Sequence, residues 1–177
     1  MPVPASLLVA SGAALGVFLM MLAELRISRA NERALCARGA IEPPRDVYRL
    51  MAWIYPLAFA GMAVEGAIRA TPPSDAAVLG GLVFAGAKAV KFWAMATLGE
   101  RSTFRVLVLR GTPLIETGPY AYIRHPNYVG VLGELGGFAL LVAAPLTGLT
   151  SVSVFAVLIA RRIQVEEEAL GIRSDAR

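Results

Sequence analysis

Long apolar stretches, separated by shorter polar ones, dominate this chain of 177 residues. Hydrophobic residues make up 56% of the sequence and charged residues 17%, and the hydrophobic residues gather into continuous runs. Helices of soluble proteins instead show their apolar residues as periodic stripes. A helix that crosses a hydrocarbon core of about 30 Å needs about 20 mostly apolar residues. The pattern predicts five transmembrane helices, over residues 6–25, 48–68, 76–98, 128–142 and 146–163.

The connections between these segments predict how the helices are joined. Only Ala143, Ala144 and Pro145 separate the last two segments, so we expect these two to form a helical hairpin. We expect residues 1–177 to form one all-α membrane domain, with a long loop at 99–127 and a tail at 164–177. Residues 1–23 contain no Lys or Arg, so the first segment lacks the basic region of a signal peptide and is expected to be retained.

The arginines gather on one side of the predicted helices. The opposite connections carry only Arg69. The basic side carries Arg26, Arg29, Arg33, Arg38, Arg45, Arg49, Arg101, Arg105, Arg110, Arg124, Arg161, Arg162, Arg173 and Arg177. Because an excess of Lys and Arg marks the cytoplasmic side, we expect the N-terminus outside and the C-terminus and long loop in the cytoplasm.

Charge and residue content exclude several classes of function. The net charge of +4 fits an anionic membrane surface. No nucleic-acid partner is expected, because the aromatic residues are not interleaved with basic ones as a stacking platform requires. Cys36 is the only cysteine and His125 the only histidine, so we expect neither an internal disulfide nor a thiolate or imidazole metal site.

Two polar segments carry the candidate chemistry. The loop at 99–127 is too long for a simple connection, and loops of this length are usually functional. It contains Gly118-Pro119-Tyr120 and ends in Arg124-His125-Pro126-Asn127-Tyr128. Pro126 suits the first turn of a helix, which leaves free N–H groups near Asn127 and Tyr128 that suit a carboxylate. Beyond the fifth segment, Arg162 and Glu166 are four residues apart and therefore share a helix face.

These motifs resemble those of the isoprenylcysteine carboxyl methyltransferase family, which is similar in turn to the membrane phospholipid methyltransferases. The resemblance covers about residues 98–170 and includes Thr97-Leu98-Gly99, Gly130, Arg162-Ile163, Glu166-Glu167 and Leu170. It implies S-adenosylmethionine as the cofactor and Arg162 as the residue that meets the acceptor carboxylate. The implied cofactor-binding residues are Thr112, Pro113, Leu114, Ile115, Tyr120, His125, Pro126, Asn127, Tyr128 and Glu166.

The residue content agrees with this chemistry. A carboxylate has a reference pKa of about 4 and is already ionised at neutral pH, so its methylation needs no general base. It needs alignment with the methyl group, and arginine grips carboxylates in a bidentate manner. The expected acceptor is a lipophilic small molecule or a prenyl-type molecule, which reaches the site from the membrane lipid.

The sequence departs from the family pattern at two places. Glu100-Arg101-Ser102-Thr103 stands where relatives usually carry an aromatic residue soon after the Leu-Gly pair. Relatives also usually continue past the Glu-Glu helix with a Tyr-rich segment, whereas this sequence ends at Arg177. These departures predict a cofactor pocket that is more open or is completed by a partner.

Several charged residues fall inside or near the apolar segments. Lys88 and Lys91 lie either within the membrane or, if the span begins earlier, at its interface, where Lys91 is close enough to reach out. Glu134 is expected to face the cavity or to pair with Lys88, which makes Lys88 and Glu134 candidate substrate contacts. Glu24 and Glu65 are expected at the membrane interfaces.

Three alternatives remain open at the level of sequence. A phospholipid amine N-methyltransferase keeps the fold, but Arg162 argues against an amine acceptor while Glu134 would argue for one. A sterol-type reductase should show further spans and a nucleotide-binding tail. A non-catalytic membrane scaffold or transporter subunit predicts a blocked cofactor pocket. The glycine-rich segments permit close helix packing without deciding the oligomeric state.

Overall fold

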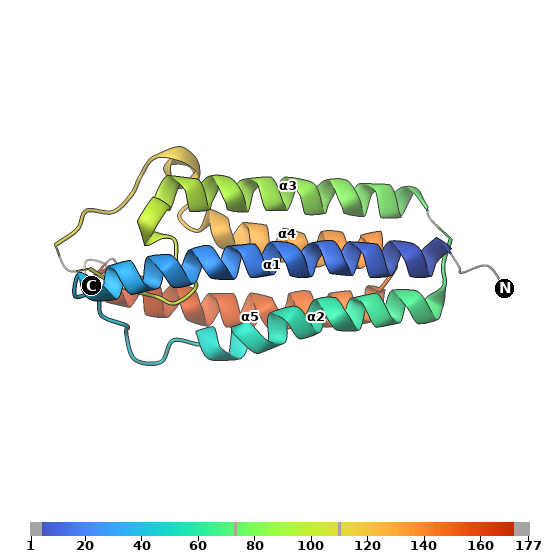
Figure 1. Cartoon of the computed structure of the whole chain (residues 1–177), viewed down its shortest axis with the longest axis horizontal. Helices are drawn as coiled ribbons and strands as arrows, with labels where there is room; N and C mark the ends of the chain where they lie inside the picture. Colours follow the sequence, from blue (N-terminus) through green and yellow to red (C-terminus); the bar gives the residue numbers. More distant parts are fainter. Residues whose placement is uncertain (1–4, 73, 110, 172–177) are drawn as a thin grey trace.

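The computed structural model describes residues 5–72, 74–109 and 111–171. The basic positions Arg110, Arg173 and Arg177 and the end of the predicted tail lie outside these residues. Five helices run side by side along one long axis (Figure 1): α1 Ala5–Ala37, α2 Tyr48–Arg69, α3 Asp75–Leu98, α4 Pro126–Leu141 and α5 Pro145–Ala169. Two 3-10 turns, η1 Gly99–Arg101 and η2 Gly118–Ala121, flank the α3–α4 loop. No strand forms among the described residues, and the predicted all-α class is confirmed.

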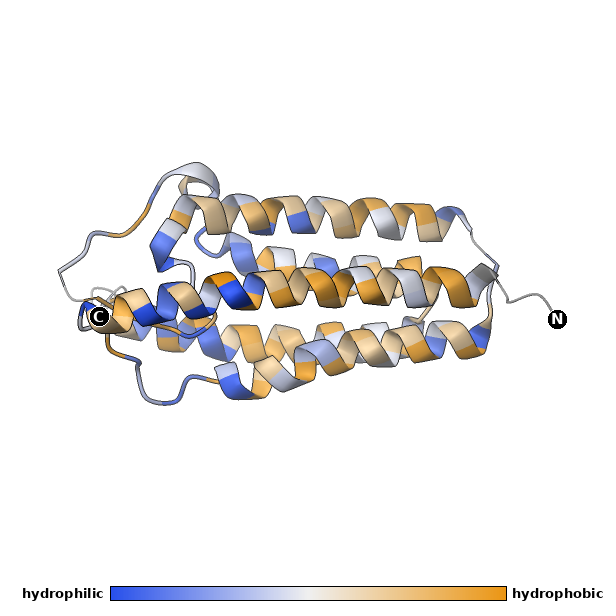
Figure 2. Ribbon diagram, viewed as in Figure 1, coloured by the Kyte–Doolittle hydropathy of each residue, from blue (hydrophilic) through white to orange (hydrophobic). Residues whose placement is uncertain are grey.

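The outer surface of the bundle is apolar, as expected of an integral membrane protein. Figure 2 shows hydrophobic residues along most of the helices, with hydrophilic residues gathered toward the end where the described chain finishes. Large side chains such as Leu15, Leu57 and Leu82 are more than half exposed. α1, α2, α3 and α5 are long and apolar enough to cross a membrane. α4 has 16 residues, or about 24 Å at 1.5 Å per residue, which is short for a hydrocarbon core of about 30 Å.

The first helix is longer than the hydropathy pattern predicts. α1 continues to Ala37, so Arg26, Arg29 and Arg33 lie on a helix rather than in a loop. α5 likewise continues past the predicted apolar segment to Ala169 and carries Arg162 and Glu166. We call the end of the bundle where α1, α3 and α5 finish the basic end.

α3 and α4 form the closest helix pair, because glycines let their backbones touch. A Cβ atom added at Gly137 would lie 2.5 Å from the Phe84 nitrogen and 2.8 Å from the Gly80 oxygen. A Cβ at Gly80 would lie 2.4 Å from the Leu141 nitrogen. Aromatic rings continue this contact into the core, where Phe138 and Phe59 pack edge to face at 4.9 Å. Small residues are what close packing of membrane helices requires.

We expect Gly137→Val to destabilise the protein by at least about 1–3 kcal/mol, because the added methyl groups would force α3 and α4 apart. Gly136→Val is the matched control: it adds the same side chain one residue away, where nothing lies within 4 Å of the added Cβ. Thermal unfolding of both variants in one detergent measures the difference. Equal melting temperatures would show that the glycine contact does not limit stability.

The opposite end of the bundle is closed by a helix cap. The Glu65 carboxylate on α2 accepts hydrogen bonds from the Leu146 N–H at 3.2 Å and the Thr147 N–H at 2.7 Å. These N–H groups belong to the first turn of α5, where they have no partner within the helix. Glu65 thus lies near the end of its helix, as expected, and fixes the start of α5, the second helix of the α4–α5 hairpin.

Candidate active site

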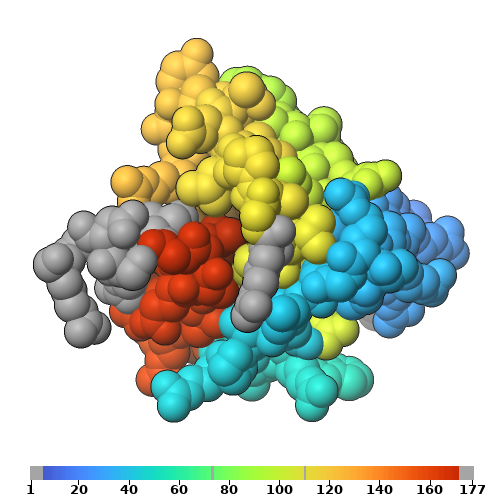
Figure 3. Space-filling model, turned by 90° about the vertical axis from the view of Figure 1, so that its left-hand side faces the viewer, coloured from blue at the N-terminus to red at the C-terminus, as the bar shows by residue number. Residues whose placement is uncertain are grey.

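Two separate sequence motifs meet at the basic end. Gly118 adopts a positive φ of +58°, and a Cβ there would lie 2.5 Å from the Thr97 Oγ1 atom. Only glycine fits both the conformation and the space. The following residue, Pro119, is buried. The contact therefore packs the Gly118-Pro119-Tyr120 turn directly on the end of α3. Seen from the basic end, the α3–α4 loop, the end of α5 and the α1–α2 loop gather on one face (Figure 3).

The start of α4 has fewer free N–H groups than the sequence predicts. Pro126 occupies the first turn, as expected. The Tyr128 N–H, however, donates a hydrogen bond to the His125 carbonyl oxygen at 3.1 Å. Of the two N–H groups expected to be free, Tyr128's is therefore used within the chain.

Side chains from α4 and α5 interlock beside this helix start. The Tyr128 hydroxyl donates to Glu166 Oε2 at 2.8 Å, and the Tyr128 ring stacks on His125 at 5.5 Å between centroids. His125 lies between two carboxylates: its Nδ1 is 3.8 Å from Glu166 Oε2 and its Nε2 is 3.4 Å from Glu167 Oε1. Burial, reinforced by Glu166, raises the pKa of Tyr120, so this phenol stays protonated at neutral pH. The carboxyl motif on α5 and the histidine motif on α4 thus form one cluster.

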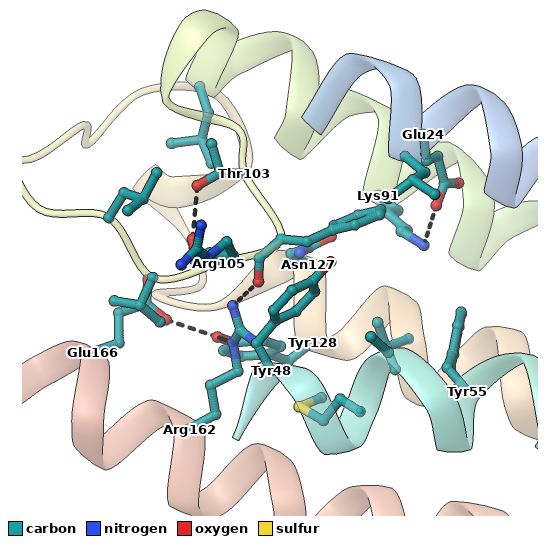
Figure 4. Close-up of a pocket in the computed structure, with 18 of the residues that line it drawn as sticks. Glu24, Tyr48, Tyr55, Lys91, Thr103, Arg105, Asn127, Tyr128, Arg162 and Glu166 are labelled. Carbon is teal, nitrogen blue, oxygen red and sulfur yellow. Dashed lines mark hydrogen bonds and ion pairs between the residues drawn. The ribbon is translucent and has the colours of Figure 1, made fainter. Parts of the chain in front are cut away.

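Arg162 is buried and held on several sides. Its Nε donates to the Tyr128 hydroxyl at 2.9 Å, and its NH2 group hydrogen-bonds to the Phe104 carbonyl oxygen. Its NH1 group lies 3.5 Å from Asp46 Oδ1. Figure 4 shows Arg162 beside Tyr128 and Tyr48, with Glu166 on the other side of the guanidinium. These contacts fix the orientation of the guanidinium. Its contact with the Asp46 carboxylate is at the upper limit of hydrogen-bonding distance.

The part that the α1–α2 loop plays in this site was not predicted from the sequence. Asp46 accepts hydrogen bonds from the Tyr48 and Val106 N–H groups, both at 3.0 Å, and so ties the α1–α2 loop to the α3–α4 loop. A β-bridge between Ile41 and Val108 joins the same two loops. The only local signal for Asp46 is its position two residues before the start of α2, which is typical of a helix cap.

A cavity of about 640 Å³ connects these groups. Its wall includes six of the predicted site residues: Tyr120, His125, Asn127, Tyr128, Arg162 and Glu166. Thr112, Pro113, Leu114 and Ile115 are not among the described residues that line it; Pro113 and Leu114 are exposed. Pro126 is buried behind the wall. The α3–α4 loop instead contributes the segment 103–108. The rest of the wall is largely apolar and comes mostly from α1 and α2.

A ring of four buried charges lies farther along the bundle; we call Glu24, Lys88, Lys91 and Glu134 the charge ring. Each carboxylate contacts both ammonium groups. Lys88 Nζ is 2.7 Å from Glu24 and 2.9 Å from Glu134, and Lys91 Nζ is 2.7 Å from Glu24 and 3.3 Å from Glu134. The Tyr55 hydroxyl also donates to Glu134 at 2.6 Å.

The charge ring settles three expectations. Lys88 and Lys91 are 5% and 3% exposed, so neither is interfacial and Lys91 does not reach out to the membrane surface. Glu24 is 1% exposed, and its expected interfacial position is wrong, because it binds both lysines inside the bundle. Of the two alternatives for Glu134, the structure shows the pairing with Lys88, and Glu134 is not among the described residues that line the cavity.

One buried acceptor atom of the site suits a contact with the implied cofactor. Asn127 Oδ1 is buried and has no hydrogen-bond partner among the described residues. A buried acceptor without a donor costs free energy, so such an atom marks a place for a missing donor. S-adenosylmethionine carries amino groups that can donate there. Among the described residues, no group of three or more His, Cys, Asp or Glu side chains has the arrangement of a metal site.

Comparison with known proteins places the chain in a family. Residues 78–172 match the model of the isoprenylcysteine carboxyl methyltransferase family, and this range holds the α3–α4 loop, α4 and α5. A Bacillus subtilis (strain 168) protein described as "Uncharacterized protein YpbQ" is 32% identical over 149 residues, which cover 84% of this chain and 88% of that protein. A Haemophilus influenzae protein described as "Uncharacterized protein" is 26% identical over 147 residues, 82% of this chain and 86% of its own length. The chain therefore belongs to the isoprenylcysteine carboxyl methyltransferase family of membrane methyltransferases.

Proposed function

We propose that this protein transfers a methyl group from S-adenosylmethionine to the carboxylate of a lipophilic acceptor. One observation carries the proposal. A single cavity is lined by His125 and Glu166, by the buried Arg162 and by apolar residues that come mostly from α1 and α2. A water-soluble cofactor and a membrane-soluble acid need two such different surfaces side by side.

The side chains divide into a cofactor side and an acceptor side. Tyr120, His125, Asn127 and Glu166 would hold the cofactor, with Glu166 and Asn127 Oδ1 accepting hydrogen bonds from its amino groups. Bound S-adenosylmethionine supplies an electrophilic methyl group. Arg162 would bind the acceptor carboxylate, because its 3.5 Å contact with Asp46 is long enough to leave donor capacity on NH1.

The proposed reaction asks little of acid–base chemistry. The acceptor carboxylate is already ionised, and transfer of the methyl group needs no proton to move. Arg162 has only to orient one carboxylate oxygen toward the methyl carbon, and its neighbours already fix its own orientation. Rigid alignment of two reactants accounts for large rate gains without a general base.

We further propose five spans, with the N-terminus outside and the site at the cytoplasmic surface. The basic residues on α1, η1 and α5 support this orientation. α4 is short, but many of its residues, including Leu135, Gly137 and Phe138, are buried, which suits a span that does not meet lipid at both surfaces. The acceptor would enter from the bilayer between α1 and α2, where Leu22 and Trp53 line the cavity and are 52% and 75% exposed.

The alternative functions receive less support. A phospholipid amine acceptor would need a carboxylate to receive it, but Glu24 and Glu134 are each paired with two lysines. A non-catalytic scaffold would be favoured by a blocked pocket, whereas the cavity is continuous from Glu166 to Phe18.

Calorimetric titration of S-adenosylmethionine into the detergent-solubilised protein tests the cofactor side. We expect Glu166→Ala to weaken the affinity about 10- to 100-fold, because the variant loses a charged hydrogen-bond acceptor. Glu168→Ala is the matched control, since Glu168 is exposed on the same helix and is not among the cavity-lining residues. If Glu166→Ala binds as tightly as the control, the cofactor binds elsewhere.

A further inference from the structure

The charge ring touches the cavity on one side only. Glu24, Lys91 and Tyr55 belong to the cavity wall, whereas Lys88 and Glu134 are not among the described residues that line it. We call Glu24 and Lys91 the front pair, and Lys88 and Glu134 the rear pair. Figure 4 shows the front pair and Tyr55 at the end of the cavity away from Arg162 and Glu166. The cavity therefore has polar groups at two places along an otherwise apolar wall.

The two lysines of the charge ring differ in how fully they are hydrogen-bonded. Lys88 donates to both carboxylates, at 2.7 and 2.9 Å. Lys91 Nζ lies 2.7 Å from Glu24 Oε2 but 3.3 Å from Glu134 Oε1, and this second oxygen has no hydrogen bond among the described residues. An ammonium group has three N–H donors. The geometry thus leaves donor capacity on the lysine that lines the cavity.

The balance of charges in the ring limits what can bind there. Two ammonium groups face two carboxylates, so the ring offers no net charge to a second ionic group. An uncharged oxygen can accept from Lys91 without adding an unpaired buried charge. Apolar side chains of similar volume often stabilise a protein as well as buried ion pairs do. Charges buried at membrane depth usually mark a functional site.

We propose that the front pair is a second subsite for the acceptor, in which Lys91 donates a hydrogen bond to an uncharged carbonyl or hydroxyl oxygen. This inference rests on the proposed function, in which Arg162 holds the carboxylate of the same molecule. Glu134 in the ring is six positions after Tyr128, which contacts Arg162, so the two polar sites lie about 9 Å apart along the bundle. The acceptor class is then a long-chain acid with an oxygen substituent along its chain.

Palmitic acid and a series of keto-palmitic acids, with the keto group at successive chain positions, test this subsite. Each is titrated into the full-length protein in detergent, and methyl ester formation with S-adenosylmethionine is measured separately. We expect one keto isomer to bind about 10- to 100-fold more tightly than palmitic acid, the effect of a hydrogen bond to a charged group. Its kcat/KM should rise by a similar factor.

Two double variants separate recognition from folding. Glu24→Gln with Lys91→Met neutralises the front pair, and Lys88→Met with Glu134→Gln neutralises the rear pair, so each removes one cation and one anion. The front variant should lose the preference for the keto isomer and still bind palmitic acid. The rear variant should keep the preference.

Equal binding of palmitic acid and every keto isomer by the unaltered protein would overturn the subsite, whatever the variants do. Loss of the preference in both double variants alike would also overturn it, because the ring would then affect binding only by maintaining the fold around the cavity. Preferred binding of one keto isomer without ester formation would support the subsite and contradict carboxyl transfer, so the two proposals fail separately.

Discussion

Replacing Arg162 with Ala is expected to lower methyl transfer by at least about 100-fold while leaving the affinity for S-adenosylmethionine unchanged. Arg162 orients the acceptor in the proposed mechanism, and removal of one preorganised donor at a reacting oxygen typically costs this much. The proposed cofactor contacts His125 and Asn127 lie at the start of α4, whereas Arg162 lies on α5. The measurement is the initial rate of methyl transfer beside a calorimetric titration of the cofactor.

Arg161→Ala is the matched control, because Arg161 is the neighbouring arginine on α5 and is exposed. It removes the same charge from the same region of the membrane surface. Arg162→Lys keeps the charge beside Asp46 but loses the planar pair of donors, so we expect a large loss of rate here as well. Activity of Arg162→Ala equal to that of Arg161→Ala would show that Arg162 only anchors the helix.

Replacing Lys88 with Met is expected to destabilise the protein by about 3–5 kcal/mol, the cost of removing one partner from a buried ion pair. Glu24 and Glu134 would then share the single ammonium of Lys91 inside the bundle. The charge ring also joins α1 to α3 and α4, so its loss would loosen the wall of the cavity. Thermal unfolding in detergent measures the change.

The double variant Lys88→Met with Glu134→Gln should be more stable than Lys88→Met alone. It restores the balance of one carboxylate with one ammonium, and neutral groups leave no uncompensated charge. Such non-additivity is expected of residues in one network. A double variant less stable than the single one would mean that local packing, rather than charge balance, controls this part of the core.

The helices were largely predictable because hydropathy reports directly on the membrane. The predicted segment 48–68 corresponds to α2 Tyr48–Arg69, and the segment 76–98 to α3 Asp75–Leu98. Hydropathy failed at the end of α1, where the apolar run stops but the helix continues to Ala37. The residues after Glu24 include Ala, Leu, Arg and Glu, which favour helix regardless of burial.

The candidate site was predictable only where it depends on local motifs. His125 and Glu166 were found from their motifs, and the fold brings them within 3.8 Å of each other. Glu24 was misplaced because one charge near the end of an apolar run resembles an interfacial residue. Its partner Lys88 is 64 residues away in sequence, so only the tertiary structure shows the pair. Asp46 was missed for the same reason, since its contacts with Val106 and Arg162 join segments that are far apart in the sequence.

The central claim, methylation of a carboxylate, is tested most directly by the chemical stability of the transferred label. The purified protein is given methyl-tritiated S-adenosylmethionine with palmitic acid, keto-palmitic acids or a prenylated cysteine, and the lipid-soluble product is treated with base. A methyl ester releases its label as volatile methanol, whereas a methylated amine does not. We expect base-labile, volatile label in the unaltered protein and its near loss in Arg162→Ala. Lipid-soluble label that resists base would contradict carboxyl methylation and point to an amine acceptor.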